Sequence, residues 1–213
     1  MAAPQAAPLV AEKAVGDSEQ DPNNYEINLN TKTGLKLTKA YKARPAKTEF
    51  AAFAAGCFWG VEDEYRKEPG VVATAVGFSG GHVKNPSYKL VCGDKTGHAE
   101  TVLVEFDPAK TSYSKLLDLF WVVHNPTEVN HQGVDYGTQY RSVIFCFNDE
   151  QRKEALASKK AEEKAEHLED QIATEIVPSA PFYRAEEYHQ QWVENGHPSS
   201  CHRRKKGDLK PEL

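Results

Sequence analysis

Residues 50–60 read Phe50-Ala51-Ala52-Phe53-Ala54-Ala55-Gly56-Cys57-Phe58-Trp59-Gly60, and a segment with helical character follows over residues 61–67. The apolar run predicts a strand that turns into a helix at Cys57. At a helix N-terminus, unpaired backbone N–H groups and the macrodipole favour negative charge, so we expect the pKa of this thiol to be lowered. Gly56 allows a tight turn and leaves room for a substrate. The stretch therefore predicts a reactive cysteine.

The two aromatic residues that follow this cysteine, Phe58 and Trp59, predict a small hydrophobic pocket for an apolar end of the substrate. The alternative is a buried cysteine at a strand-helix junction with two core aromatics, because free cysteine is often a small buried hydrophobe. The glycines at both ends of the Gly-Cys-Phe-Trp-Gly group favour the reactive site.

Length and charge restrict the class of protein. A chain of 213 residues fits one domain with extra residues at its ends, and it can bury roughly 70% of its unfolded surface. A net charge of -5 does not favour binding to nucleic acid or to an anionic membrane. Since we find neither an apolar run of membrane-spanning length nor a signal-peptide core, we expect a cytoplasmic protein. The basic run 202–206 is interpreted as a solvated end of the tail rather than as a nuclear localisation signal.

Cysteine usage points to redox or nucleophilic chemistry. Cysteines are too sparse for a secreted disulfide framework and form no C-x-x-C pair; they are Cys57, Cys92, Cys146 and Cys201. A zinc site built from His197, Cys201 and His202 falls short of four ligands. We therefore predict neither a metal nor a cofactor.

Patterning predicts an α+β domain over 47–194. A flexible N-terminal arm that is disordered or drapes on the surface, 1–46, precedes it, and a coiled mobile tail, 195–213, follows. A targeting role for the arm stays open. Strands are expected over 48–55, 71–78, 99–106, 139–147 and 172–177, and helices over 61–67, 112–124, 149–170 and 185–194. The order strand-helix-strand-strand-helix-strand is that of a ferredoxin-like split βαβ sheet, here with added helices. The long loop 79–97 is a candidate wall of the site.

Strand periodicity singles out Glu100, which falls on the same face as Val102, Val104 and Phe106. A carboxylate on a core-facing side is costly unless it is neutral or paired. Desolvation raises a carboxyl pKa, so Glu100 is a candidate acid that stays protonated near pH 7. The alternative is that Glu100, near the start of its strand, reaches solvent.

Three blocks of the sequence resemble the type A peptide methionine sulfoxide reductases. They are Gly56-Cys57-Phe58-Trp59-Gly60, Gly97-His98-Ala99-Glu100 and Asp135-Tyr136-Gly137-Thr138-Gln139-Tyr140-Arg141-Ser142. The resemblance runs from about residue 48 to about residue 202. It leaves only the N-terminal arm and the last residues uncovered.

The resemblance implies that Glu100 lies beside Cys57 and donates a proton to the sulfoxide oxygen. It also implies that Tyr88 and Tyr140 hydrogen-bond this oxygen and that Asp135 contributes to substrate binding. The chemistry requires such groups, because thiolate attack on a sulfoxide sulfur places negative charge on oxygen, and O–H donors in a dry pocket stabilise that charge.

Product chemistry requires a second thiol. Oxygen transfer leaves Cys57 as a sulfenic acid, which condenses readily with a thiol. Cys201, in a Gly/Pro/Ser-rich coil, is the expected resolving cysteine; Cys92 in the loop is the rival, and Cys146 is expected to be buried packing. Some family members have two C-terminal recycling cysteines, whereas this chain has only Cys201 there. We therefore expect thioredoxin to reduce a Cys57–Cys201 disulfide directly.

We expect a monomeric enzyme that reduces methionine sulfoxide, free or in proteins, and the resemblance implies the S epimer at sulfur. Two alternatives remain. A cysteine hydrolase would use Cys57 with His124 or His131 as base and Asp135 as the orienting group, although we expect surface or loop roles for both histidines. A non-catalytic interaction module would use the sheet as a platform.

Overall fold

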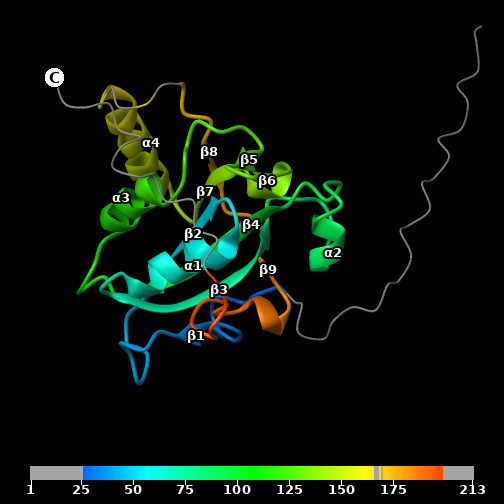
Figure 1. The fold of residues 1–213 in the computed structure, drawn as a ribbon. Helices are drawn as coiled ribbons and strands as arrows, with labels where there is room; N and C mark the ends of the chain where they lie inside the picture. The colour runs from blue at the N-terminus through cyan, green and yellow to red at the C-terminus, as the bar shows by residue number, and fades with distance from the viewer. Residues whose placement is uncertain (1–25, 166–167, 169, 199–213) are drawn as a thin grey trace, which may run out of the picture.

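A mixed sheet organises the chain in the computed structural model, which describes residues 26–165, 168 and 170–198 (Figure 1). The strands of this sheet follow the order β1-β3-β4-β2-β7-β8, and β9 also pairs with β3. Their bounds are β1 (Lys36–Leu37), β2 (Glu49–Ala55), β3 (Val71–Ser79), β4 (Ala99–Phe106), β7 (Ser142–Cys146), β8 (Glu175–Pro178) and β9 (Tyr183–Arg184). A hairpin of β5 (His131–Gln132) and β6 (Asp135–Tyr136) lies outside the sheet.

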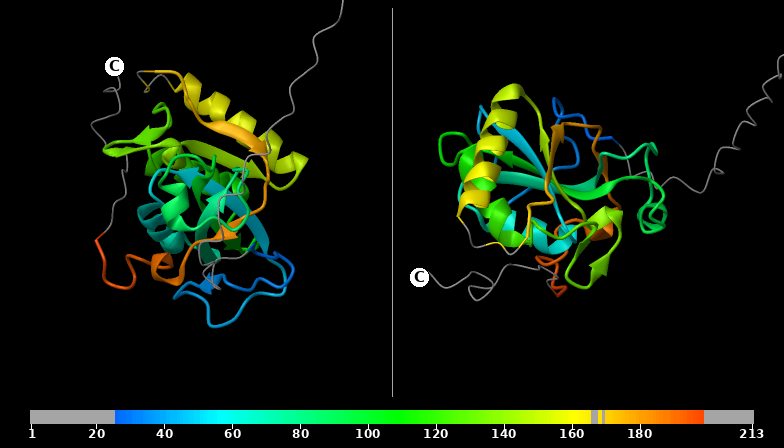
Figure 2. Two further views of the ribbon diagram at one scale, coloured as in Figure 1. Left: turned by 90° about the vertical axis from the view of Figure 1, so that its right-hand side faces the viewer. Right: turned by 90° about the horizontal axis from the view of Figure 1, so that it is seen from above.

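The helices are α1 (Phe58–Lys67), α2 (Tyr88–Val91), α3 (Tyr113–Val123) and α4 (Asp149–Lys164), with 3₁₀ turns at Thr138–Tyr140 and Glu187–His189. Helix α3 begins at the predicted cap, where the Ser112 side chain accepts a hydrogen bond from the Lys115 N–H. Figures 1 and 2 show α3 and α4 side by side at one end of the molecule and α2 at the other.

Strand pairing gives the centre of the sheet a defined topology. Neighbours within β3-β4-β2-β7 are antiparallel, and β8 runs parallel to β7. In the unit β2-α1-β3, strand β4 lies between the two strands, and in the unit β4-α3-β7, strand β2 does so. Each helical connection therefore crosses over one strand of the other unit.

Most predicted helices and strands are present, but some begin or end at other residues than predicted, because tertiary contacts determine the conformation there. The strand predicted over 139–147 starts only at Ser142, because Thr138–Tyr140 forms a 3₁₀ turn. The helix predicted over 149–170 ends at Lys164, and the one predicted over 185–194 is reduced to the 3₁₀ turn Glu187–His189. The loop 79–97 contains the short helix α2.

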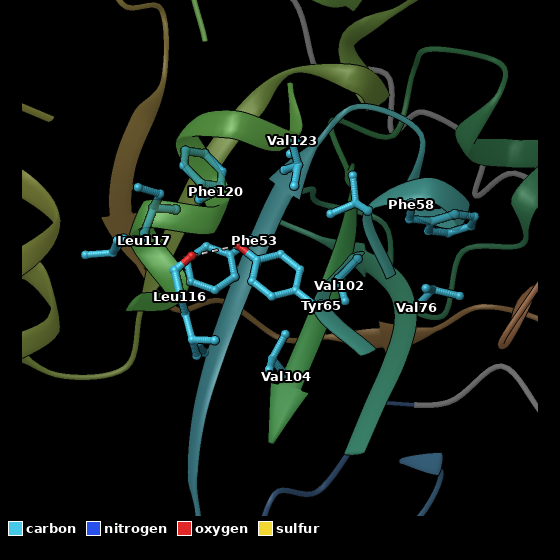
Figure 3. Packing of buried hydrophobic residues seen from close by; sticks show 14 of the residues in the cluster. Phe53, Phe58, Tyr65, Val76, Val102, Val104, Leu116, Leu117, Phe120 and Val123 are labelled. Atoms are coloured by element: carbon cyan, nitrogen blue, oxygen red, sulfur yellow. Dashed lines mark hydrogen bonds between the residues drawn. The ribbon is translucent and has the colours of Figure 1, made fainter. Parts of the chain in front are cut away.

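The helix-covered face of the sheet holds the larger aromatic core. Phe53 of β2 stacks on Tyr65 of α1 with ring centroids 5.0 Å apart, and the Tyr65 hydroxyl donates to the Leu116 carbonyl of α3 at 3.1 Å (Figure 3). Val102 and Val104 belong to the same buried cluster. This packing fixes α1 on the sheet and so determines where its first residue, next to Cys57, lies.

The opposite face of the sheet is covered by irregular chain, which corrects part of the prediction for residues 1–46. Over residues 26–46 the chain packs on the sheet, which agrees with the alternative of a segment draped on the surface and not with a disordered arm; residues 1–25 lie outside the described part. Ile27 and Leu35 are buried with Leu103 and Phe182 in a second cluster. The physical reason is that small apolar residues line this face and require a cover, which no helix supplies within residues 26–165 and 170–198.

A buried ion cluster fastens the same segment. Glu105 of β4 has no exposed side-chain surface and accepts hydrogen bonds from Lys32 and Arg44, each at 2.8 Å, and from Thr48. Burial acts to raise the pKa of Glu105, but these hydrogen bonds outweigh it and the pKa is lowered. Two cations thus tie residues 32–44 to the sheet. Among the described residues, no helix is both long and apolar enough to cross a bilayer.

We predict that Arg44→Ala destabilises the fold by about 1–3 kcal/mol, because it removes a charge-assisted hydrogen bond from the buried Glu105 carboxylate. Urea unfolding measures this loss. Lys47→Ala is the matched control, since the Lys47 side chain is 81% exposed and its ammonium lies 3.8 Å from Glu49. Equal stability of both variants would show that the cluster does not fasten this segment.

Candidate active site

Cys57 lies between β2 and α1, as the sequence predicts. It is the N-cap residue of α1 and is 9% exposed. Gly56 has φ of +90°, which confirms the tight turn. The space beside Gly56 is not open to a substrate, however, because a Cβ there would lie 2.7 Å from Cγ of the buried Gln132 side chain. Glycine is therefore required at position 56 for its backbone conformation and for the close approach of Gln132. It positions Cys57 and does not make room for a ligand.

Glu100 lies directly against the first turn of α1. The Phe58 N–H donates to Oε2 of Glu100 at 3.0 Å, and Glu100 is only 1% exposed. Burial raises the pKa of Glu100 to about 8; the Phe58 hydrogen bond acts to lower it, and the negative charge of Asp135 acts to raise it. Near neutral pH the carboxyl is therefore mostly protonated. The alternative of a solvent-facing Glu100 is wrong.

Two tyrosines complete the polar side of the site. Burial and then the negative charge of Glu100 raise the pKa of both Tyr88 and Tyr140, and the charges of Cys57 and Asp135 also act on Tyr140. Both hydroxyls are therefore protonated and able to donate. These mutual influences show that the structure brings Cys57, Glu100, Tyr88, Tyr140 and Asp135 together.

Part-buried polar contacts join the second and third sequence blocks and attach the loop 79–97 to them. The Arg141 guanidinium donates to the carbonyls of Gly97 at 3.1 Å and Thr138 at 3.0 Å. His98 accepts from the Gly81 N–H at Nδ1, and its Nε2 lies 2.7 Å from the Val83 carbonyl, so Nε2 carries the proton. Burial lowers the pKa of His98, consistent with this neutral form. The loop 79–97 is thus attached to the start of β4, next to Glu100.

Trp59 provides an aromatic surface beside the cysteine. Its indole N–H donates to Nδ1 of His189 at 3.0 Å, and its ring stacks on Trp192 with centroids 4.1 Å apart and planes 9° apart. His197 stacks in turn on Trp192 at 3.9 Å. Phe58 is buried and contacts the ring of His189 at 5.3 Å. The chain after β9 therefore packs against the residues that follow Cys57.

Hydrogen bonds to Glu62 and a part-buried ion pair of Arg66 anchor the same C-terminal segment to α1. Glu62 is 1% exposed and accepts hydrogen bonds from both the backbone and side-chain N–H groups of Gln191, at 2.8 and 2.9 Å. Arg66 pairs with Glu194 at 3.0 Å. Burial raises the pKa of Glu62 despite its hydrogen bonds. The path of residues 191–194 is thereby fixed on the helix that begins at Cys57.

The remaining candidate cysteines and histidines differ in burial and in their contacts. Cys146 is buried in β7, as predicted, whereas Cys92 is exposed and adjoins Tyr88, with which it shares a hydrogen bond. Cys201 lies outside the described residues. Of the surface or loop role expected for His124, the surface part is wrong: the residue follows the end of α3 but is fully buried, and its ring nitrogens lie 2.9 Å from the Phe120 carbonyl and 2.7 Å from the Ser142 hydroxyl. These contacts give no support to a hydrolase that uses His124 as base.

Sequence reasoning missed Gln132, Glu186 and His189. Glu186 accepts from the Tyr88 N–H at 2.9 Å, and Gln132 bonds both backbone groups of Asn125. All three are polar residues without a motif of their own, and only the fold shows that they are buried at the site. Within the described ranges, no cluster of three His, Cys, Asp or Glu side chains forms a metal site.

The arrangement of a cysteine at the start of α1, with a buried carboxyl bonded to the first N–H of that helix, is one that an enzyme of the thiol-dependent class can use. A family model for peptide methionine sulfoxide reductases matches residues 49–211. The peptide methionine sulfoxide reductase MsrA of Methanosarcina acetivorans is 59% identical over 171 residues, which are 80% of this chain and 91% of the relative. The chain therefore belongs to the peptide methionine sulfoxide reductase family, and it is an oxidoreductase.

Solved structures agree with this assignment. Mxr1 from Saccharomyces cerevisiae in its reduced form has a TM-score of 0.69 and 36% identity, with 79% of this chain and 97% of that chain covered. Mxr1 in complex with Trx2 has a TM-score of 0.52 and 26% identity, with 79% and 99% covered.

We predict that Glu100→Gln removes a pH-dependent part of the free energy of unfolding. Because the folded pKa of about 8 lies above the ordinary value of 4.5, folding retains a proton that the unfolded chain releases, so Glu100 costs stability progressively as pH rises from about 4.5 to about 8. The effect is at most roughly 5 kcal/mol. Urea unfolding at pH 5 and pH 8 should show the Gln variant gaining relative to wild type at the higher pH. A constant difference would contradict the raised pKa.

Proposed function

We propose that this enzyme reduces the S epimer of methionine sulfoxide, free or in proteins, with Cys57 as nucleophile and Glu100 as acid. The observation that supports it most directly is the buried Glu100 carboxyl, whose pKa of about 8 leaves it protonated beside the cysteine. A neutral carboxylic acid in a closed pocket is the group that a developing oxyanion requires.

In the first step the Cys57 thiolate attacks the sulfoxide sulfur and Glu100 gives its proton to the sulfoxide oxygen. Tyr88 and Tyr140 donate hydrogen bonds to the same oxygen, and Asp135 orients the substrate. Phe58 and Trp59 supply the apolar surface for the methyl end of the substrate. Transfer of the oxygen to the cysteine sulfur releases methionine and leaves Cys57 as a sulfenic acid.

In the second step the Cys201 thiol attacks the sulfenic sulfur and water leaves. The Cys57–Cys201 disulfide is then exchanged with the dithiol of a thioredoxin, which becomes oxidised as both enzyme thiols are restored. Mxr1, a structural neighbour, has been solved in complex with Trx2, which supports a thioredoxin as the partner.

We also infer that the crossed units β2-α1-β3 and β4-α3-β7 form the split βαβ of a ferredoxin-like domain. Residues 26–46 belong to its packed body, and in this proposal Cys201 reaches the site from the segment 195–213, of which residues 199–213 lie outside the described part. The enzyme acts in the cytoplasm as a monomer in this proposal. The acidic net charge supports the absence of nucleic acid and membrane partners.

We predict that Glu100→Gln lowers kcat by about 10²- to 10⁴-fold with little change in substrate binding, the range typical of lost general acid catalysis. The wild-type rate should fall as pH rises through about 8, because the carboxyl then loses its proton. Sulfoxide reduction with dithiothreitol measures both. Cys57→Ser should abolish activity at every pH. A Gln variant with wild-type rate would remove Glu100 from the mechanism.

We predict that Cys201→Ser releases one methionine per enzyme in a single turnover and then stalls with thioredoxin as reductant. Dithiothreitol should restore turnover, because a small thiol attacks the sulfenic acid directly. The matched variant is Cys92→Ser, which removes the exposed thiol next to Tyr88 and should cycle normally with thioredoxin. If Cys92→Ser stalls and Cys201→Ser cycles, the resolving cysteine is in the loop.

A further inference from the structure

Two buried polar atoms close to Trp59 and Tyr88 have no hydrogen-bond partner among the described residues. They are Oε2 of Glu186 and Nε2 of His189, and they face each other at 3.9 Å. His189 is fully buried, and Glu186 is 9% exposed. Unpaired polar atoms of this kind are costly in a protein interior, so their arrangement calls for a reason.

The other atom of each group has a short and directed bond. Nδ1 of His189 accepts from the Trp59 indole N–H at 3.0 Å, and Oε1 of Glu186 accepts from the Tyr88 backbone N–H at 2.9 Å. The ring of His189 also lies 4.4 Å from that of Tyr88. His189 thus binds the aromatic residue Trp59, and Glu186 binds the backbone of the hydroxyl donor Tyr88.

These bonds determine the tautomer of His189. An indole N–H is only a donor, so Nδ1 has to be unprotonated, and the single ring proton lies on Nε2, toward the Glu186 carboxylate. Burial lowers the pKa of His189 to about 4, which agrees with a neutral ring. A proton on Nδ1 would instead direct two N–H groups at each other.

We propose that Glu186 and His189 are a positioning pair that holds Trp59 and Tyr88 in place around the substrate: the carboxylate favours the Nε2–H tautomer, and this tautomer leaves Nδ1 free to bind the Trp59 indole. Neither residue touches the reacting atoms. The pair acts through the orientation of the Trp59 ring and the backbone of Tyr88. The kinetic consequences assume the reaction proposed above, whereas the tautomer does not depend on it.

Nuclear magnetic resonance of the ¹⁵N-labelled enzyme tests the tautomer without any assay of activity. We expect His189 to have protonated Nε2 and unprotonated Nδ1 at pH 7. In Glu186→Gln, the amide oxygen has to stay on the Tyr88 N–H, so the amide NH₂ faces Nε2 of His189 and shifts the ring toward the Nδ1–H form. A wild-type ring with the proton on Nδ1, or an unchanged tautomer in Glu186→Gln, would overturn the proposal.

Kinetics with a methionine sulfoxide peptide and dithiothreitol test the consequence. His189→Phe keeps an aromatic ring but removes the acceptor, and we expect KM to rise about tenfold, as for one lost hydrogen bond, with a smaller effect on kcat. His189→Gln retains an acceptor and should restore most of the KM. In a Trp59→Phe background, His189→Phe should add nothing, because the donor is already gone.

Equal damage from His189→Phe and His189→Gln, or an additive effect in the Trp59→Phe background, would contradict a role through the indole bond. If the wild type were inactive toward the sulfoxide, the proposed function would fail while the tautomer measurement still decided the state of the pair.

Discussion

The hydrogen bond from the Phe58 N–H to Glu100 is the interaction on which the site depends. It joins the first turn of α1 to the start of β4 at 3.0 Å and so fixes the distance between the cysteine and the acid. It also opposes protonation of Glu100, because an N–H donor favours the carboxylate. Burial is the stronger effect. The site therefore balances a bond that orients the acid against a desolvation that keeps it protonated.

The placement of Glu100 could be predicted because the alternation of β4 is regular. Val102 and Val104 lie in the helix-side core, so a residue two positions earlier has to share that side. Cys57 could be located for a similar local reason, since an apolar strand ends at a glycine there. Both arguments use neighbours in the sequence, and the structure agrees with both.

The contacts that the sequence could not supply join distant segments. Gln132 packs against Gly56, Glu186 binds the backbone of Tyr88, and residues 26–46 cover the sheet through Glu105. Side-chain chemistry made none of these visible, because a buried glutamine or glutamate looks like a surface residue until its partner is known. The predicted start of the strand at 139 and the predicted helix over 185–194 were wrong for the same reason. Tertiary contacts override local propensity at Ser142 and at Glu187.

The stack of Trp59, Trp192 and His197 holds the chain beside the first turn of α1 as far as His197. Cys201 follows His197 by four positions, and four extended residues span at most about 14 Å. With Cys201 as the resolving thiol, a segment this short gives it an effective concentration in the millimolar range at a site beside Trp59. The sulfenic acid on Cys57 would then be captured before a further oxidant reached it, and irreversible oxidation to the sulfinic acid would be suppressed. The aromatic packing would in this way protect the catalyst from the oxidants whose damage it repairs.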